Sequence, residues 1–184
     1  MAKKSNRNTR GRIVSAAWKL FYEQGYEDTT VEEIIELSGT SKGSFYHYFD
    51  GKDALLSTLS SLFDEKYEEL TGLLTPEMTA MEQLLFLNRE LFHMIEDSIS
   101  LDLLARLYST QLTTNGEKHL LDHNRIYYKL LRKIIAKGQS EGQLSSRSNV
   151  NEMVKLYALC ERALLYDWCL CAGEYALTEY SAKV

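Results

Sequence analysis

Residues 29–49 read TTVEEIIELSGTSKGSFYHYF, a pattern of two short helices separated by a turn. Thr30 and Glu33 have the spacing of a capping box, in which the Thr30 hydroxyl and the Glu33 carboxylate each accept a hydrogen bond from the other residue's backbone amide. The apolar positions of the first helix share one face: Val31, Ile34 and Ile35. Gly39 can end this helix, and Ser41 is a suitable N-cap for the next. Two short helices joined by a tight glycine-containing turn predict a helix-turn-helix, although other motifs share this outline.

The second of these helices, residues 41–49, carries two different faces. Phe45 and Phe49 are i, i+4 neighbours, and we expect them to pack in the core beneath the preceding helix, near Trp18 and Phe21. The opposite side combines hydroxyls, a lysine, a glycine and two polar-tipped rings, contributed by Ser41, Lys42, Gly43, Ser44, Tyr46 and His47.

These groups suit contacts with phosphates and a DNA groove. Gly43 costs up to about 1 kcal/mol relative to alanine in a helix, and close approach of the backbone to a rigid surface would explain it. Lys52 follows closely enough to reach the DNA backbone beside the same groove. We therefore interpret this face as a surface for the DNA major groove; the alternative is a solvated face without a partner.

The remaining sequence predicts further helices and no strands. Apolar residues at helical spacing predict a first helix over 9–24, a long helix from 50 or 51 to about 74, and others over 77–96, 99–113, 122–140 and 149–172, with a short piece near 116–121. A polar loop is expected over 142–148, and Asn149 with Glu152 can start the helix after it. A single proline and the lack of alternating β-branched runs complete the prediction of an all-α protein.

Charge is unevenly distributed along the 184 residues. The net charge is −5, yet residues 1–20 hold six basic and no acidic side chains, so the basic N-terminal arm favours a polyanionic partner. A solvated tail would explain residues 1–8 equally well. No signal peptide is recognised, and the three cysteines fit reduced thiols, so we expect a cytoplasmic protein.

The segment 153–172 is apolar at sixteen of its twenty positions. Four charged residues oppose a membrane span, since each costs about 2.5–3.5 kcal/mol at the centre of a lipid-embedded helix: Lys155, Glu161, Arg162 and Asp167. We expect this helix to be buried against its own domain and against a second subunit.

The sequence resembles the TetR family of bacterial transcriptional regulators over about residues 9–60. The resemblance rests on Thr29-Thr30-Val31, Ile34, the run from Ser38 to Phe49, Lys52 and Leu55. It implies an all-α homodimer with an N-terminal three-helix helix-turn-helix domain (1–51) and a C-terminal helical domain for ligand binding and dimerisation (52–184). The acidic Glu32, Glu33 and Glu36, and Thr40 in place of an aliphatic residue, depart from the usual pattern.

By position, the resemblance assigns roles to particular residues. Contacts to DNA are implied for Thr30, Ser41, Lys42, Gly43, Ser44, Tyr46, His47 and Lys52. Helices 122–140 and 149–172 would build the dimer bundle, with an interface that includes Tyr127, Leu131, Ile134, Leu156, Leu164 and Trp168. The expected partners are double-stranded DNA with a palindromic operator, a second copy of the chain and an unidentified small-molecule effector held between the helices of 77–121.

The expected function is therefore that of a sequence-specific DNA-binding regulator, a repressor released by its effector. Two alternatives stay open: a protein-interaction module that uses the C-terminal helices, and a ligand-responsive DNA binder without classical induction. His119 and His123 have a spacing that can bind zinc, but no third ligand is evident. We expect the protein to bind no metal and no cofactor and not to be an enzyme. We also expect Cys169 and Cys171 to be inert structural residues.

Overall fold

The computed structural model describes residues 2–113 and 118–184, with side chains described from Thr9 onward. Every regular element in these ranges is a helix, which confirms the all-α prediction. The chain forms two compact units, residues 1–59 and 60–184. The first unit includes the segment 52–59, which the sequence analysis assigned to the second domain.

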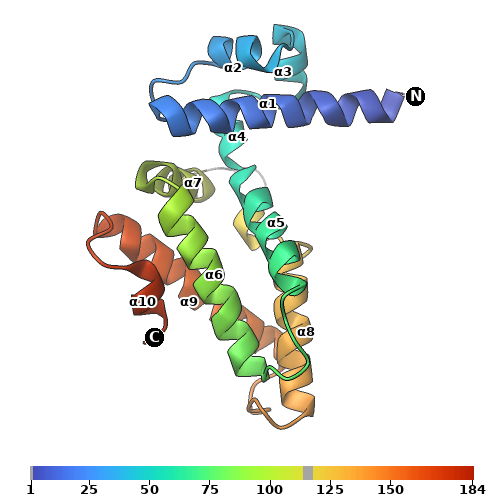
Figure 1. Cartoon of the computed structure of the whole chain (residues 1–184), viewed down its shortest axis with the longest axis vertical. Coiled ribbons are helices and arrows are strands. Elements are labelled where there is room, and N and C mark those ends of the chain that lie inside the picture. Colours follow the sequence, from blue (N-terminus) through green and yellow to red (C-terminus); the bar gives the residue numbers. More distant parts are fainter. Residues whose placement is uncertain (1, 114–117) are drawn as a thin grey trace. The chain divides into compact units, whose positions relative to one another are not determined.

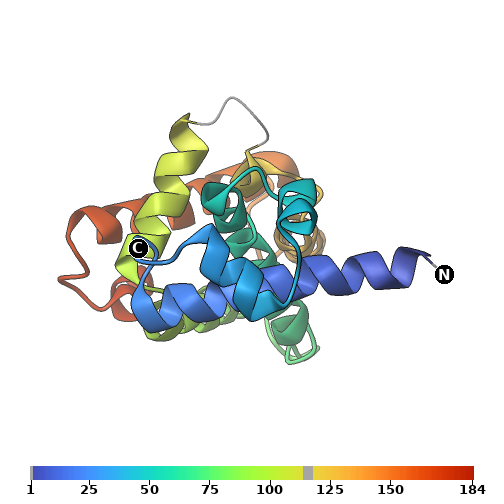
Figure 2. The ribbon, with the colours of Figure 1, turned by 90° about the horizontal axis from the view of Figure 1, so that it is seen from above.

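The first unit is a bundle of short helices around one long helix. Its elements are α1 (Ala2–Gln24), α2 (Val31–Ser38), α3 (Lys42–Tyr48) and α4 (Lys52–Leu56). The α2 and α3 helices lie on one side of α1 (Figure 1), and the N-terminal part of α1 extends past them (Figure 2). The first helix thus begins earlier than the predicted residue 9. The core of the first unit contains Ile13, Ala17, Phe21, Ile34, Phe45 and Leu55.

The turn between α2 and α3 is built as the sequence predicts. Gly39 has φ of 58°, the left-handed conformation that glycine adopts without steric cost, and its amide donates to the Glu36 carbonyl. The Arg12 guanidinium of α1 donates to the carbonyls of Ser38 and, at 2.7 Å, of Gly39. A charged side chain from α1 therefore holds the turn in place.

The predicted long helix over about 50–74 is instead two helices, α4 and α5 (Leu59–Thr71). The interruption falls at Ser57 and Thr58, whose hydroxyls donate to the carbonyls of Ala54 and Leu55. Thr58 also accepts a hydrogen bond of 2.9 Å from the indole of Trp18. Side-chain hydroxyls that bond to nearby carbonyls compete with the helical ladder, and the tertiary contact to Trp18 positions this turn.

The second unit contains the rest of the chain. After α5 come α6 (Ala80–Ser98), α7 (Leu101–Thr113), the 3₁₀ helix η1 (His119–Leu121), α8 (Ile126–Ser140), α9 (Val150–Leu170) and α10 (Leu177–Ser181). Capping boxes start α6 at Thr79 and α9 at Asn149, the second as predicted. Of the predicted short piece near 116–121, residues 116 and 117 lie outside the described residues, Lys118 precedes η1, and η1 itself covers 119–121. The α10 helix was not predicted.

Long-range contacts hold the second unit together. In α8, Gly138 lies so close to α6 that an added Cβ would come within 2.5 Å of the Ala80 Cβ. At the other end, the Glu96 carboxylate of α6 accepts hydrogen bonds from the backbone amides of Leu177 (2.6 Å) and Thr178 (3.1 Å), which secures the start of α10. Within the described ranges, none of the helices combines the length and the apolar character that crossing a membrane requires.

Candidate DNA-binding surface and ligand cavity

The α3 helix separates its side chains as the sequence analysis predicts. Phe45 is fully buried and Phe49 is 4% exposed, so both rings belong to the core of the first unit. The rings lie 5.9 Å apart between centroids. On the opposite side, the structure exposes Ser41, Lys42, Gly43, Tyr46 and His47 and half-buries Ser44.

Local hydrogen bonds define the start of this surface. The Ser41 hydroxyl caps α3 by accepting from the Ser44 amide at 3.1 Å, and its oxygen lies 2.9 Å from the Ser44 hydroxyl. Gly43 has open space where a side chain would project, since the nearest atom to an added Cβ is the Ser41 Oγ at 4.0 Å. Packing inside the subunit therefore does not explain the glycine.

Thr30 forms the predicted capping box at the start of α2. The Glu33 carboxylate accepts from both the amide and the hydroxyl of Thr30 at 2.7 Å, and the Glu33 amide donates to the Thr30 hydroxyl at 3.2 Å. These hydrogen bonds hold the pKa of Glu33 below its ordinary value, first through the Thr30 amide and then through the hydroxyl. Thr30 is exposed, with its hydroxyl held in one orientation.

The two lysines of the predicted DNA surface differ in their surroundings. Lys42 is exposed, and its ammonium lies 3.3 Å from the Glu32 carboxylate of α2. Lys52 donates to the carbonyls of Tyr26 (2.6 Å) and Glu27 (3.2 Å) and lies 4.3 Å from the centroid of the Tyr26 ring. The ammonium group of Lys52 is thus hydrogen-bonded to backbone carbonyls of the first unit, whereas that of Lys42 faces the exposed Glu32 carboxylate.

The predicted dimer residues divide into two groups. Tyr127, Leu131, Ile134 and Trp168 are each at most 8% exposed, and they pack inside the subunit. The Trp168 indole also donates to the Tyr175 carbonyl at 2.9 Å. These four side chains have little exposed surface in the single subunit, and their place in an interface stays a prediction.

Another face of α9 is apolar and exposed. Leu156, one of the predicted interface residues, is 61% exposed, whereas Leu164 is half-buried. The exposed α9 stripe follows helical spacing and consists of Leu156, Leu159, Cys160, Ala163, Tyr166 and Leu170. Cys160 is exposed here, and Cys169 and Cys171 are partly so, which differs from the burial expected for the cysteines. Sequence reasoning missed most of this stripe because α9 is apolar nearly all round, so its pattern does not indicate the outward face.

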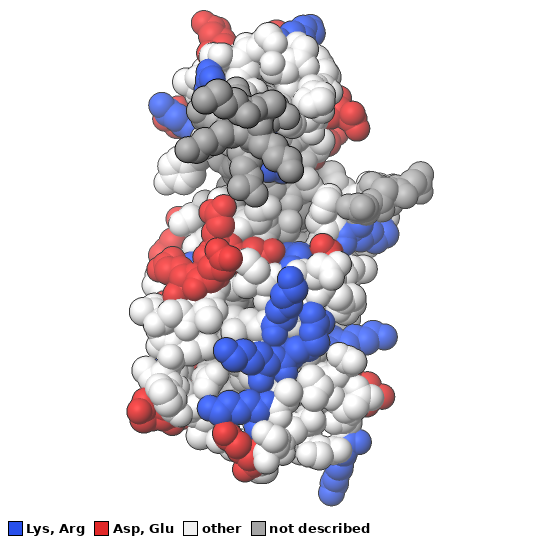
Figure 3. Space-filling view, turned by 90° about the vertical axis from the view of Figure 1, so that its right-hand side faces the viewer, with Lys and Arg blue, Asp and Glu red and all other residues white. Residues whose placement is uncertain are grey.

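The neighbouring helix α8 presents charge to the solvent. Its exposed cations are Lys129, Lys133 and Lys137, spaced by four residues along one face. Figure 3 shows basic side chains gathered over the side of the second unit on which α8 lies. The apolar surface available to a partner is therefore contributed by α9 rather than by α8.

The second unit contains a small, partly open cavity of about 50 Å³. It is lined by aromatic and aliphatic side chains together with Glu161, Arg162 and Arg125. The rings come from Phe63, Tyr67, Phe92, Tyr108 and Tyr127. A pocket is expected between the helices of 77–121, and the observed cavity is also lined by residues of α5, α8 and α9.

Glu161 is 6% exposed at this cavity. Its carboxylate accepts hydrogen bonds from the Asn88 amide at 2.9 Å and the Tyr127 hydroxyl at 2.6 Å. Burial raises the pKa of Glu161 above its ordinary value, and these hydrogen bonds oppose that shift. Nothing in the local sequence identifies this cluster, since its members are 34 and 73 residues from Glu161.

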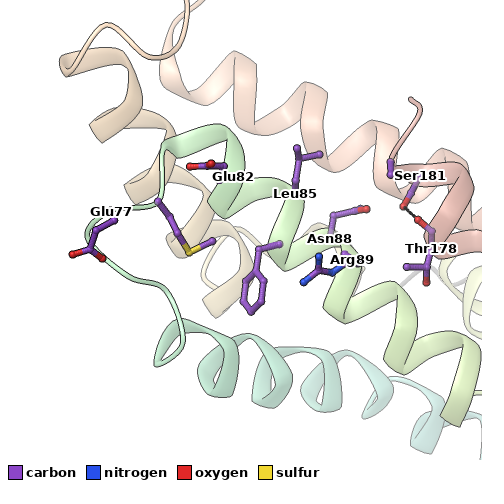
Figure 4. Close-up of a pocket in the computed structure, with 10 residues that line it drawn as sticks. Glu77, Glu82, Leu85, Asn88, Arg89, Thr178 and Ser181 are labelled. Atoms are coloured by element: carbon purple, nitrogen blue, oxygen red, sulfur yellow. Dashed lines mark hydrogen bonds between the residues drawn. The ribbon is translucent and has the colours of Figure 1, made fainter.

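A larger open groove of about 610 Å³ lies between the first half of α6 and α10. Figure 4 shows Leu85, Asn88 and Arg89 on α6 and Thr178 and Ser181 on α10 lining it. Asn88 therefore borders the open groove and also bonds to the buried Glu161.

The two histidines with zinc-binding spacing do not share a helical face. His119 starts η1, whereas His123 lies beyond its end, with its ring 4.6 Å from that of Tyr128. Within 2–113 and 118–184, no cluster of three or more His, Cys, Asp or Glu side chains could hold a metal ion.

Comparison with known proteins places the helix-turn-helix in a family. Residues 13–59 match the family described as bacterial regulatory proteins, tetR family. The transcriptional regulator QacR of Staphylococcus aureus is 36% identical over 62 residues, 34% of this chain and 33% of that protein. TtgR of Pseudomonas putida is 34% identical over 68 residues, 37% of this chain and 32% of that protein. The chain thus aligns with about a third of the length of these curated relatives.

Solved structures match nearly the whole chain. Thermus thermophilus FadR, a TetR-family transcriptional repressor in complex with lauroyl-CoA, has a TM-score of 0.78 and 25% identity, over 95% of this chain and 90% of that one. Bacillus subtilis FadR in complex with stearoyl-CoA shares the fold, with a TM-score of 0.70 and 21% identity over 95% and 94% of the two chains. Residues 13–59 thus match the TetR family of bacterial regulatory proteins, and the fold of the chain is similar to that of a TetR-family transcriptional repressor.

Proposed function

We propose that this protein is a sequence-specific DNA-binding regulator of transcription that acts as a repressor and is released by a small-molecule effector. The observation that carries the proposal is the exposed polar face of α3, which presents Lys42, Tyr46 and His47 while Phe45 stays in the core. Phosphate contacts would supply most of the affinity, and a few side chains would read base edges. Since bacterial DNA lies in the cytoplasm, the proposal places the protein there.

Dimerisation through the exposed α9 stripe is part of this proposal. An apolar stripe on an otherwise packed helix is stabilised by burial against a second copy. A two-fold dimer can place its recognition helices about 34–36 Å apart, which matches successive major grooves on one side of DNA. The operator is then roughly palindromic.

Effector control would operate through the second unit. The cavity is lined by Phe63 and Tyr67 of α5, the helix that directly follows α4 in the chain. A ligand that binds one conformer of this unit better than another shifts the population, and it lowers DNA affinity if that conformer spaces the two recognition helices wrongly. The acyl-CoA complexes of the FadR proteins support a ligand-binding role for this fold.

Selection of DNA from a random pool, followed by fluorescence anisotropy on the selected sequence, tests the proposal. The expected site is palindromic, and log affinity is expected to fall linearly with log salt. Lys42→Ala is expected to weaken binding and to reduce the salt slope by about 1. Lys133→Ala on α8 is the matched control and is expected to retain the wild-type affinity.

The alternative of a protein-interaction module is favoured by one observation, the exposed α9 stripe. Failure to enrich any DNA sequence, together with a purified monomer, would support that alternative. Enrichment of a site whose affinity does not respond to any bound ligand would instead support a DNA binder without classical induction.

A further inference from the structure

The buried carboxylate of Glu161 is held by neutral groups. Its hydrogen-bonding neighbours are the Asn88 amide and the hydroxyls of Tyr127 and Tyr157, none of which carries a compensating positive charge. An ionised carboxylate inside a protein is costly unless a cation accompanies it, even when it is hydrogen-bonded. The folded subunit thus contains a carboxylate whose electrostatic partner is missing from its hydrogen-bonding shell.

The two arginines at the cavity have other partners. Arg125 forms a two-pronged ion pair with Asp64, with Nε–Oδ2 and Nη2–Oδ1 distances of 3.0 Å. Arg162, which follows Glu161 along α9, donates to the Tyr128 hydroxyl at 3.0 Å. Arg162 contributes to the electrostatics of Glu161, but its guanidinium is bonded elsewhere.

Aromatic rings surround the space beside the carboxylate. Phe63, Tyr67, Phe92, Tyr108 and Tyr127 line the same cavity. The negative face of an aromatic ring attracts a cation, and the attraction is stronger where water is excluded. Burial also raises the pKa of Tyr67 and Tyr127, so these phenols stay neutral at physiological pH.

We propose that this cavity binds a small organic cation, with the cationic nitrogen at the Glu161 carboxylate and the hydrophobic body among the rings. This inference rests on the proposed function, because it names the chemical class of the effector. The existing volume of about 50 Å³ has room for only a few water molecules, so the ligand must displace lining side chains. Asn88 borders both the Glu161 carboxylate and the open groove. A ligand entering from the groove would reach Glu161 by displacing the Asn88 side-chain amide.

Three probes of similar size and different charge test the proposal. Phenethylammonium is the cation, 2-phenylethanol the neutral analogue and phenylacetate the anion. Isothermal titration of the full-length protein is expected to show the tightest binding for the cation and the weakest for the anion. Equal binding of all three, or preference for phenylacetate, overturns the proposal and would indicate that Arg162 selects the ligand.

Two variants connect the binding to the carboxylate. Glu161→Gln keeps the size of the side chain and one of its two accepting oxygens while removing the charge, and it is expected to weaken phenethylammonium binding at least about tenfold, as for loss of a charged hydrogen bond. Glu65→Gln changes the net charge equally at an exposed position on α5 and is expected to bind as the wild type does. Circular dichroism checks that both variants are folded.

The outcome separates this inference from the proposed function. Cation binding that is unaffected by Glu161→Gln, or no binding of the cation at millimolar concentration, overturns the cavity assignment even if selected DNA is bound. Glu161-dependent cation binding by a protein that selects no DNA supports the site and instead contradicts the function proposed above. Glu161-dependent binding that also lowers affinity for the selected DNA supports both.

Discussion

Gly43 illustrates how a single residue separates stability from binding. The space beside its Cα is open, so Gly43→Ala introduces no clash and raises helix propensity. We expect its free energy of unfolding to increase by up to about 1 kcal/mol while affinity for the selected DNA falls, because the added methyl group keeps α3 away from the groove. Thermal unfolding and anisotropy measure the two effects. Gly11→Ala, in α1, is the control for the change in helix propensity. Equal DNA affinity of the Gly43→Ala and Gly11→Ala variants would contradict a close approach of α3 to the DNA.

The Glu32–Lys42 ion pair lies on the proposed DNA-binding surface. Both side chains are about 70% exposed, and exposed ion pairs contribute about 0–1 kcal/mol to stability. Glu32→Gln is therefore expected to leave the melting temperature nearly unchanged and to increase DNA affinity several-fold, since Lys42 becomes available to phosphate. Anisotropy at two salt concentrations measures this gain, which should shrink at high salt. A loss of affinity would show that Glu32 instead positions Lys42.

Glu161 makes the stability of the second unit depend on pH. Because its pKa is raised in the folded state, the unfolded chain loses this proton first as pH increases. The folded state is thus favoured below the ordinary glutamate pKa of 4.5, and this contribution is lost as pH rises through the folded-state value. Glu161→Gln is expected to gain stability relative to wild type as pH increases above about 4.5. Urea unfolding at several pH values tests this; a constant difference would contradict it.

At the scale of helices, the contact between α8 and α6 depends on a missing side chain. Helix propensity alone predicts that Gly138→Ala stabilises α8, but the added Cβ would lie 2.5 Å from that of Ala80 and 2.9 Å from Leu144. We expect this variant to lose about 1–3 kcal/mol of unfolding free energy, the usual effect of overpacking. Chemical denaturation measures the loss. The double variant with Ala80→Gly should recover part of it, whereas a stabilised single variant would show that the helices separate easily.

For the whole molecule, assembly is expected to depend on the exposed α9 stripe. Leu159 is 53% exposed at its centre, and Leu159→Lys would place a charge in the proposed interface. Sedimentation is expected to show a monomer, with much weaker binding to a palindromic site because the second half-site contact is lost. Leu112→Lys on α7 is the matched control, since Leu112 is 71% exposed and lies outside the stripe. If the Leu159→Lys variant still formed a dimer, the α9 stripe would not be the main dimer interface.

Local interactions allowed much of the first unit, and the start of α9 in the second, to be predicted. The Thr30–Glu33 and Asn149–Glu152 capping boxes, the Ser41 cap and the left-handed Gly39 all involve residues within a few positions of each other. The burial of Phe45 and Phe49 followed from helical spacing. These features need no knowledge of the rest of the fold, because their energies come from the backbone hydrogen bonds and periodicity of a single helix.

The sequence by itself therefore determined that the protein is all-α and contains a helix-turn-helix with one polar and one aromatic face. Only the tertiary structure decided that the helix after it breaks at Ser57–Thr58, where the Trp18 indole bonds to Thr58. It also decided which side of α9 stays exposed and that Asn88, Tyr127 and Glu161 meet at one cavity. The physical reason is range: capping and periodicity act within a few residues, whereas these features depend on contacts between residues 34 to 73 positions apart.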